Sequence, residues 1–149
     1  MRHSSCAPML ALLLGVIAPG PSFAAHWVYI GKSTGAADTI MLDTDSLHRL
    51  DPFTFVDILT VYATPRANAY DITMDRFMQR TAIDCSKRTF VPVKTIGYLQ
   101  GKRVGSSHET PDWRSKAVSI PNDPISNRIY DTVCKPAPSD RTPKQPRRP

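Results

Sequence analysis

Residues 1–24 have the layout of a secretory signal peptide, and this constrains the rest of the chain more than any other feature. A positively charged start precedes an apolar run over residues 9–18, which a Gly-Pro pair ends. Residues 22–24, Ser-Phe-Ala, place small side chains at the two positions that a signal peptidase reads. A buried N-terminal helix is the alternative, but no polar face interrupts the run, and a bilayer-spanning helix needs roughly 20 residues. The sequence predicts an exported protein that begins at Ala25 or His26.

Export leaves one possible pair of cysteines in the mature chain. Cys6 is removed with the signal, and it precedes the apolar run, so it is not the lipid-modified cysteine of a lipoprotein signal. Cys85 and Cys134 remain, and two cysteines in an oxidising compartment usually form a disulfide. Two buried free thiols or a bridge between molecules are the alternatives. The spacing is not Cys-x-x-Cys, so it does not indicate a thiol-redox enzyme.

The positive charge of the chain is concentrated at its C-terminus. The formal net charge is +6, and residues 135–149 contribute five Lys and Arg against one acid. Residues 25–134 are nearly neutral, with thirteen basic and twelve acidic residues. A nucleic-acid-binding domain would gather basic side chains on a folded face, so nucleic acid is not an expected partner. The Pro-rich tail is predicted to be disordered, and it serves either as a solubilising terminus or as a segment attracted to anionic surfaces.

Apolar and alternating runs predict an antiparallel sheet of about six strands. The predicted strands cover residues 26–31, 39–42, 53–62, 73–85, 89–99 and 103–106, and the turns or loops cover 32–38, 43–47, 50–52, 65–70 and 86–87. The third run is apolar on both faces, which is typical of a central strand. The fourth also fits helical spacing, but the short polar turn after it favours a hairpin of two strands. Pro92 confines the fifth strand to an edge or a bulge.

A helix is predicted at the C-terminal end of the domain. Asp123 is a suitable N-cap, and Pro124 suits the first helical position. Ile125, Ile129 and Val133 then recur every four residues and form one apolar stripe. Cys134 follows directly, so a disulfide to the sheet would hold this helix in place. The expected fold is a single α+β domain over residues 25–134, with a C-terminal helix and one disulfide.

No residue pattern in the chain indicates an active site, a cofactor site or a metal site. The mature histidines are His26, His48 and His108, and they lack the spacing of metal ligands. Residues 106–109, Ser-Ser-His-Glu, combine groups of a catalytic relay, but neighbours on an extended segment usually point apart. Asp43 and Asp45 resemble half of a calcium loop, without its glycine and final glutamate. Trp27 and Trp113 are expected to be core or edge aromatics rather than ligand platforms.

The order of landmarks along the chain resembles the surface-adhesin protein E family, small exported proteins of Gram-negative bacteria. The matching segments are Trp27–Gly31, Ile40–Asp43, Ser46–Arg49, Ile83–Cys85, Tyr98 with Gly101, Trp113 and Val133–Cys134. The resemblance implies a six-stranded antiparallel sheet with a helix and one disulfide. For the founding member it also implies binding to host extracellular-matrix and serum proteins. That member is a lipoprotein, whereas the present signal has no cysteine at its cleavage site.

The expected function is therefore that of a non-enzymatic, exported binding module in the periplasm or at the cell surface. The expected partner is a protein such as a host matrix protein, and no membrane-spanning segment is expected in the mature chain. The alternative is a periplasmic envelope protein, such as an inhibitor or assembly partner, with no role in adhesion. No binding residue can be assigned from the sequence.

Overall fold

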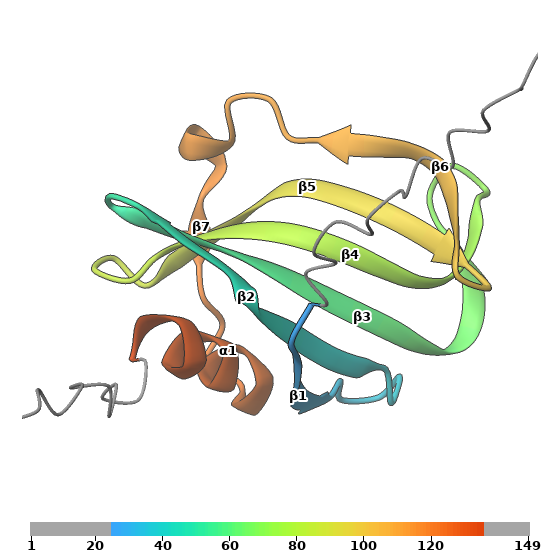
Figure 1. Ribbon diagram of the computed structural model, residues 1–149, viewed down its shortest axis with the longest axis horizontal. Helices are drawn as coiled ribbons and strands as arrows, with labels where there is room; N and C mark the ends of the chain where they lie inside the picture. The colour runs from blue at the N-terminus through green and yellow to red at the C-terminus, as the bar shows by residue number, and fades with distance from the viewer. Residues whose placement is uncertain (1–24, 136–149) are drawn as a thin grey trace, which may run out of the picture.

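Six long strands follow one another along the chain, and each pairs antiparallel with its sequence neighbours (Figure 1). The computed structural model describes residues 25–135. The long strands are β1 (Trp27–Lys32), β2 (Thr39–Leu50), β3 (Phe53–Ala67), β4 (Thr73–Asp84), β5 (Thr89–Leu99) and β6 (Lys102–Glu109). A short 3-10 helix, η1 (Trp113–Lys116), the two-residue strand β7 (Val118–Ser119) and the helix α1 (Pro124–Cys134) follow.

The predicted antiparallel meander with a C-terminal helix is confirmed. The α-helix has only 11 residues, so the described part is mostly sheet and the α+β label is approximate. The predicted signal peptide lies outside the described residues, and so does the tail predicted over residues 135–149 except for Lys135. Both stay predictions.

The turn predicted over residues 43–47 is wrong, because β2 runs through it with a bulge. Asp43 pairs with Asp57 and His48 pairs with Phe55, so residues 44–47 lie opposite a single residue of β3. The Asp43 carboxylate accepts a hydrogen bond from the Asp45 amide, the local turn that the sequence indicates, at 3.1 Å. The Ser46 hydroxyl then accepts from the Asp57 amide at 2.8 Å, which ties the bulge to the sheet.

The loop predicted to begin at residue 65 is also partly wrong, since β3 continues to Ala67. The pairing of β3 with β4 shifts between Val61 and Arg66 and then resumes at Met74. The strand therefore continues through a segment that contains proline, with an irregular pairing at that point. The local composition predicts a loop there and does not show that the pairing resumes.

Pro92 lies at a bulge inside the sheet, one of the two positions predicted for it. Thr81 pairs with Pro92 and Arg80 pairs with Lys94, so Val93 is the extra residue of β5. The carbonyl of Val93 accepts a hydrogen bond from the Thr110 amide at 2.9 Å. Proline has no backbone N–H to donate, and here it lies where the hydrogen-bond ladder between β4 and β5 is already interrupted by the bulge.

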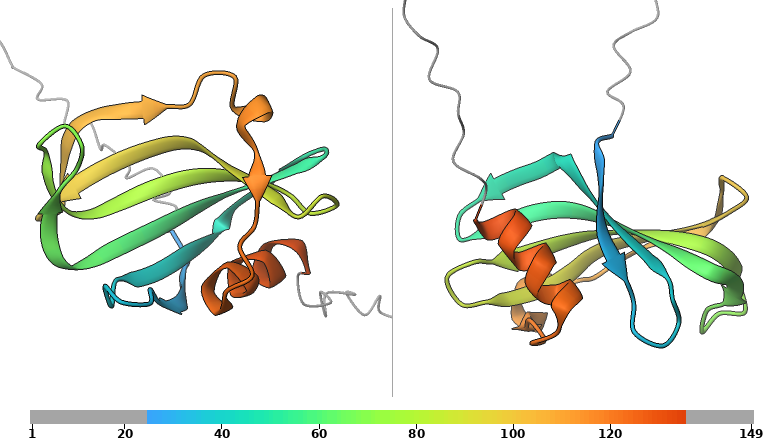
Figure 2. Two further views of the ribbon diagram at one scale, coloured as in Figure 1. Left: turned by 180° about the vertical axis from the view of Figure 1, so that it is seen from behind. Right: turned by 90° about the horizontal axis from the view of Figure 1, so that it is seen from below.

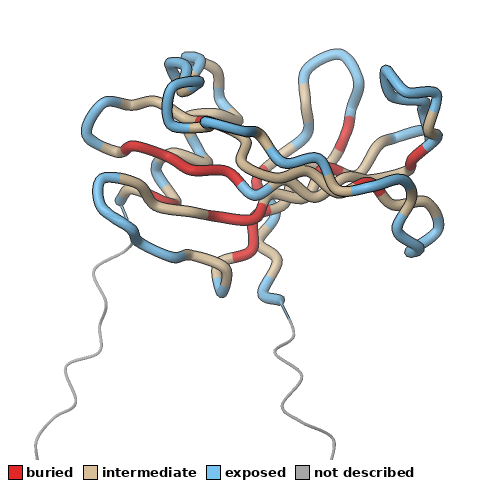
Figure 3. Tube along the Cα trace, turned by 90° about the horizontal axis from the view of Figure 1, so that it is seen from above, coloured by how far each residue is buried: buried red, intermediate tan, exposed pale blue. Residues whose placement is uncertain are grey.

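The helix α1 covers one face of the sheet, here called the helix face (Figure 2). The side chains of Ile30, Leu42, Val56, Ile83 and Val133 form the core between them, and each is at most 6% exposed. Figure 3 shows that buried positions lie along the strands, whereas the connecting loops are exposed. The hydrophobic core of the domain therefore lies between the sheet and α1.

The start of α1 is fixed as the sequence predicts. The Asp123 side chain accepts hydrogen bonds from the amides of Ile125 and Ser126, both at 2.9 Å, and Pro124 follows the cap. The Ser126 hydroxyl and these amides lower the pKa of the Asp123 carboxyl, so the cap is charged at neutral pH. The helix also approaches β1 closely, because a Cβ atom at Gly31 would overlap the Ile125 side chain.

A disulfide joins the end of β4 to the end of α1. The bond links Cys85 to Cys134, whose Cα atoms are 5.6 Å apart. The Tyr130 hydroxyl donates a hydrogen bond to the Cys85 carbonyl at 2.8 Å, which adds a second link between helix and strand. The neighbouring Asp84 carboxylate is buried, and hydrogen bonds from Ser86 and from the Lys87 amide lower its pKa. The C-terminal helix is thus held at its end as well as along its apolar stripe.

The segment after β6 passes from one face of the sheet to the other. On the face opposite α1, the Trp113 ring packs edge-on against the rings of Phe53 and Phe55, at centroid distances of 5.0 and 5.5 Å. β7 then pairs with the start of β5, and Ile120 packs against the core under α1. Trp113 is therefore a packing residue that covers one end of the second face, as expected.

Candidate protein-binding surface

The histidines and the residues that resemble catalytic or metal-binding groups have separate roles in the structure. His26 contacts the Thr44 hydroxyl through Nδ1 at 3.1 Å, and its amide donates to the buried Asp43 carboxylate at 3.0 Å. His48 lies against the Phe55 ring, and His108 pairs with Thr95 across β5 and β6. Among residues 25–135, no group of three or more His, Cys, Asp or Glu side chains could hold a metal ion.

The Ser-Ser-His-Glu segment, residues 106–109, forms part of β6. Successive side chains of a strand point to opposite faces, so its hydroxyl, imidazole and carboxylate groups do not converge. Glu109 instead forms an ion pair with Lys94 on the neighbouring strand, at 3.0 Å. Asp43 and Asp45 are likewise occupied within the β2 bulge. Trp27 lies half-buried on the edge strand β1.

The face of the sheet opposite α1, here called the open face, carries a row of apolar side chains across four strands. Met41 pairs with Leu59, Leu59 with Met78, and Met78 with Ile96, so the four side chains lie side by side. Each of them is partly exposed. Because Leu42 packs in the core under α1, the alternation of the strand places Met41 and its row on the other face.

A row of charged side chains runs beside the apolar row. Asp57 pairs with Arg80, Arg80 with Lys94, and Lys94 with Glu109 along the register. The Asp57 carboxylate accepts two hydrogen bonds from the Arg80 guanidinium, each 2.8 Å long. This contact raises the pKa of Arg80, so the arginine stays charged. Asp57 is only 7% exposed, so the pair is a fixed element of the surface.

The two rows enclose a hollow on the open face. Its volume is about 220 Å³, and it is lined by Asp57, Met78, Arg80, Lys94 and Ile96. Two of these residues are apolar and three are charged, and protein interfaces combine apolar anchor sites with polar surroundings in this way. The two methionines in the row have flexible side chains that can adapt to different partner surfaces.

Sequence reasoning missed this surface because it depends on register. Met41, Leu59, Met78 and Ile96 are far apart in the sequence, and each belongs to a different strand. The sequence shows the alternation of apolar and polar residues within each strand. It does not show how the residues of neighbouring strands align with one another. The open face is a surface that could bind a protein, and among the described residues it presents no arrangement for catalysis.

Comparison with known protein families assigns the chain to one of them. The sequence model of the family Surface-adhesin protein E matches residues 27–135. The chain therefore belongs to the surface-adhesin protein E family, and the resemblance seen in the sequence is confirmed. No curated protein matches the chain.

A solved structure is also similar, that of crystal form II of Haemophilus influenzae protein E. The TM-score is 0.46 and the sequence identity is 13%, and the alignment covers 80% of the present chain and 94% of that chain. Within residues 25–135, no helix has the length and apolar character needed to cross a membrane.

Proposed function

We propose that this protein is an exported adhesin-type module that binds a host extracellular-matrix or serum protein through its open face. Membership in the surface-adhesin protein E family supports an adhesin-like binding protein. The observation that carries the choice of surface is the hollow of about 220 Å³ among Met78, Ile96 and the charged row. A partner side chain in this hollow would contact the apolar residues Met78 and Ile96 and the charged residues beside them at the same time.

The charges around the hollow favour a polar, orientation-dependent contact. Lys94 and Arg80 line it, and their side chains are 39% and 51% exposed, so part of each remains available to a partner. Arg80 is already held by Asp57 and presents its remaining N–H groups in a fixed direction. Lys94 is the more adjustable of the two cations, because its ion pair with Glu109 lies at the surface.

A matched pair of charge reversals tests this assignment. Lys94→Glu should weaken binding at least about tenfold, because the loss of a central contact in an interface costs about 2 kcal/mol and about 1.4 kcal/mol corresponds to a factor of ten. Arg128→Glu makes the same change of charge on an exposed position of α1, away from the open face, and should change the affinity less than about twofold. Binding is measured by surface plasmon resonance against immobilised laminin, fibronectin and collagen and against immobilised host serum proteins, with ovalbumin as the negative control.

The folded state of both variants is checked by circular dichroism and thermal unfolding. Equal losses of binding in Lys94→Glu and Arg128→Glu, with both variants folded, would show that the open face is not the contact surface. Absence of binding by the natural protein to every matrix and serum protein tested would contradict the proposed class of partner.

A further inference from the structure

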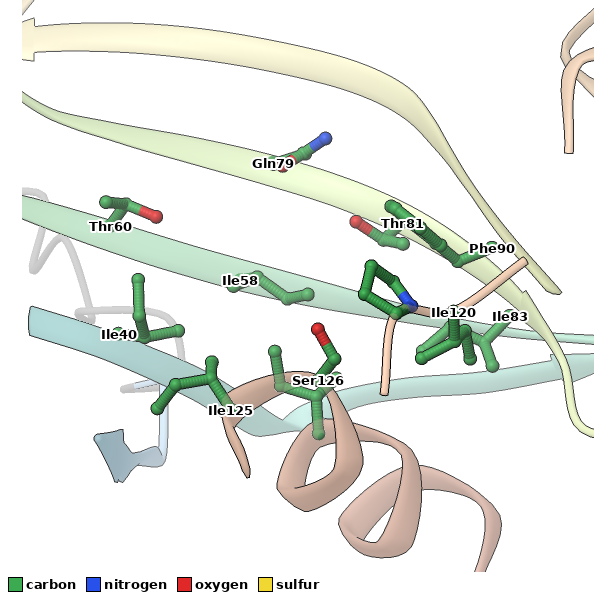
Figure 4. Close-up of a pocket in the computed structure, with 12 residues that line it drawn as sticks. Ile40, Ile58, Thr60, Gln79, Thr81, Ile83, Phe90, Ile120, Ile125 and Ser126 are labelled. Carbon is green, nitrogen blue, oxygen red and sulfur yellow. The ribbon is translucent and has the colours of Figure 1, made fainter. Parts of the chain in front are cut away.

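A second cavity lies on the opposite side of the sheet, between the helix face and α1 (Figure 4). Its volume is about 190 Å³. The walls are made of six isoleucines with Phe90 and Pro121, and four polar residues complete them: Thr60, Gln79, Thr81 and Ser126. No charged side chain of the described residues lines it. A mostly apolar pocket with a few polar groups is the usual form of a small-molecule site.

The polar residues lie on both the sheet side and the helix side of this cavity. Figure 4 shows Thr60, Gln79 and Thr81 along the sheet and Ser126 on the helix. The Ser126 hydroxyl already donates to the Asp123 carboxylate at 2.6 Å. The Thr81 hydroxyl is different, because Thr81 is only 2% exposed and its oxygen has no hydrogen-bond partner among residues 25–135.

An unpaired hydroxyl buried in a folded protein is unfavourable and calls for a physical reason. A single bound water would occupy about 30 Å³, far less than this cavity offers. An engineered apolar cavity of about 150 Å³ stays dry and binds benzene, so a space of this size and lining can take an organic molecule. Thr81 is one of the lining residues, and its unpaired hydroxyl is a polar group that a ligand oxygen would satisfy.

We propose that the cavity under α1 binds a neutral, apolar small molecule that carries one carbonyl or hydroxyl oxygen, and that the Thr81 hydroxyl pairs with that oxygen. The six isoleucines and Phe90 contact the hydrocarbon part. A charged ligand is disfavoured, because the lining offers no countercharge and burial of an unpaired ion is costly. The site lies on the opposite face from the proposed protein contact, so the inference does not depend on that function.

Titration with a defined probe tests the proposal on the mature protein. We expect 2-octanone to cause saturable amide shifts of residues around the cavity in ¹H–¹⁵N correlation spectra. Octanoate has the same number of carbons but a negative charge at neutral pH, and it should bind at least about tenfold more weakly. Toluene, which lacks an oxygen, should bind without involving Thr81.

The variant Thr81→Val keeps the shape of the side chain and replaces the hydroxyl with a methyl group. It should weaken 2-octanone roughly fivefold, the loss of one neutral hydrogen bond, and leave toluene binding unchanged. Its melting temperature should rise, since the unpaired hydroxyl is removed. Lys94→Glu, on the open face, is the control and should bind 2-octanone as the natural protein does.

Three results would overturn the proposal. The first is that 2-octanone causes no saturable shift. The second is that octanoate binds as tightly as the ketone, and the third is that Thr81→Val and the natural protein bind the ketone with equal affinity. The last result would leave an apolar cavity in which Thr81 has no role in recognition.

Discussion

Cys134→Ser should lower the free energy of unfolding by about 2–5 kcal/mol, the usual loss for a native disulfide in a small secreted domain. The bond closes a loop of 49 residues and joins the end of α1 to the end of β4. Without it, the unfolded chain gains conformational freedom, and the last turn of α1 is held only by its packing and by the Tyr130 hydrogen bond. Denaturant unfolding of the purified, oxidised protein measures the difference.

The double variant Cys85→Ser/Cys134→Ser is the control, because it removes the remaining thiol as well as the bond. It should unfold at nearly the same denaturant concentration as the single variant. Two thiols that react with an alkylating agent in the folded natural protein would contradict the disulfide, and a loss below about 1 kcal/mol would contradict its stabilising role.

Leu42→Ala should destabilise the domain by a similar amount, about 2–5 kcal/mol, because it leaves a cavity in the core under α1. Leu42 is fully buried, with 0% exposure, between the sheet and the helix. Leu50 lies on the same strand, β2, and is 53% exposed. Leu50→Ala makes the same chemical change and should cost less than about 0.5 kcal/mol.

Chemical denaturation of both leucine variants and of the natural protein measures the loss in free energy of unfolding for each substitution. A cost for Leu50→Ala equal to that of Leu42→Ala would show that the core does not lie on the helix face. Little effect of either substitution would show that burial under α1 is not the main source of stability.

Local sequence signals predicted the regular parts of this fold well. Asp123 and Pro124 mark the start of α1 correctly, because capping depends on neighbouring residues only. The strands around residues 53–62 and 73–85 were placed correctly for the same reason, since alternation and β-branched content are local properties. Only the ends of these two strands differ from the prediction, since β3 extends to Ala67 and β4 ends at Asp84.

The bulges could not be predicted in this way. Asp43 and Ser46 have the composition of a turn, and they do make local hydrogen bonds, but tertiary pairing with Asp57 keeps them inside β2. Pro92 allowed two positions, and only the pairing of both neighbouring strands shows that it occupies a bulge.

The two candidate sites depend even more on long-range arrangement. The open face exists because residues of β2, β3, β4 and β5 align in register, which no single segment encodes. The cavity exists because α1 and the segment around Ile120 close over β3 and β4. Thr81 appears in the sequence as an ordinary strand residue, and only its burial without a partner sets it apart.

The central claim is that the folded domain, rather than the basic tail, binds the partner. The direct test compares the mature chain with a variant that ends at Lys135, using the same immobilised matrix proteins at low and high salt. We predict equal affinity for the two chains and only a small effect of salt, because salt screens exposed charges over about 8–10 Å but screens a charge buried in an interface much less, and apolar contacts persist. Loss of binding on truncation with the fold intact, together with strong weakening of full-length binding by salt, would contradict the claim and assign attachment to residues 136–149.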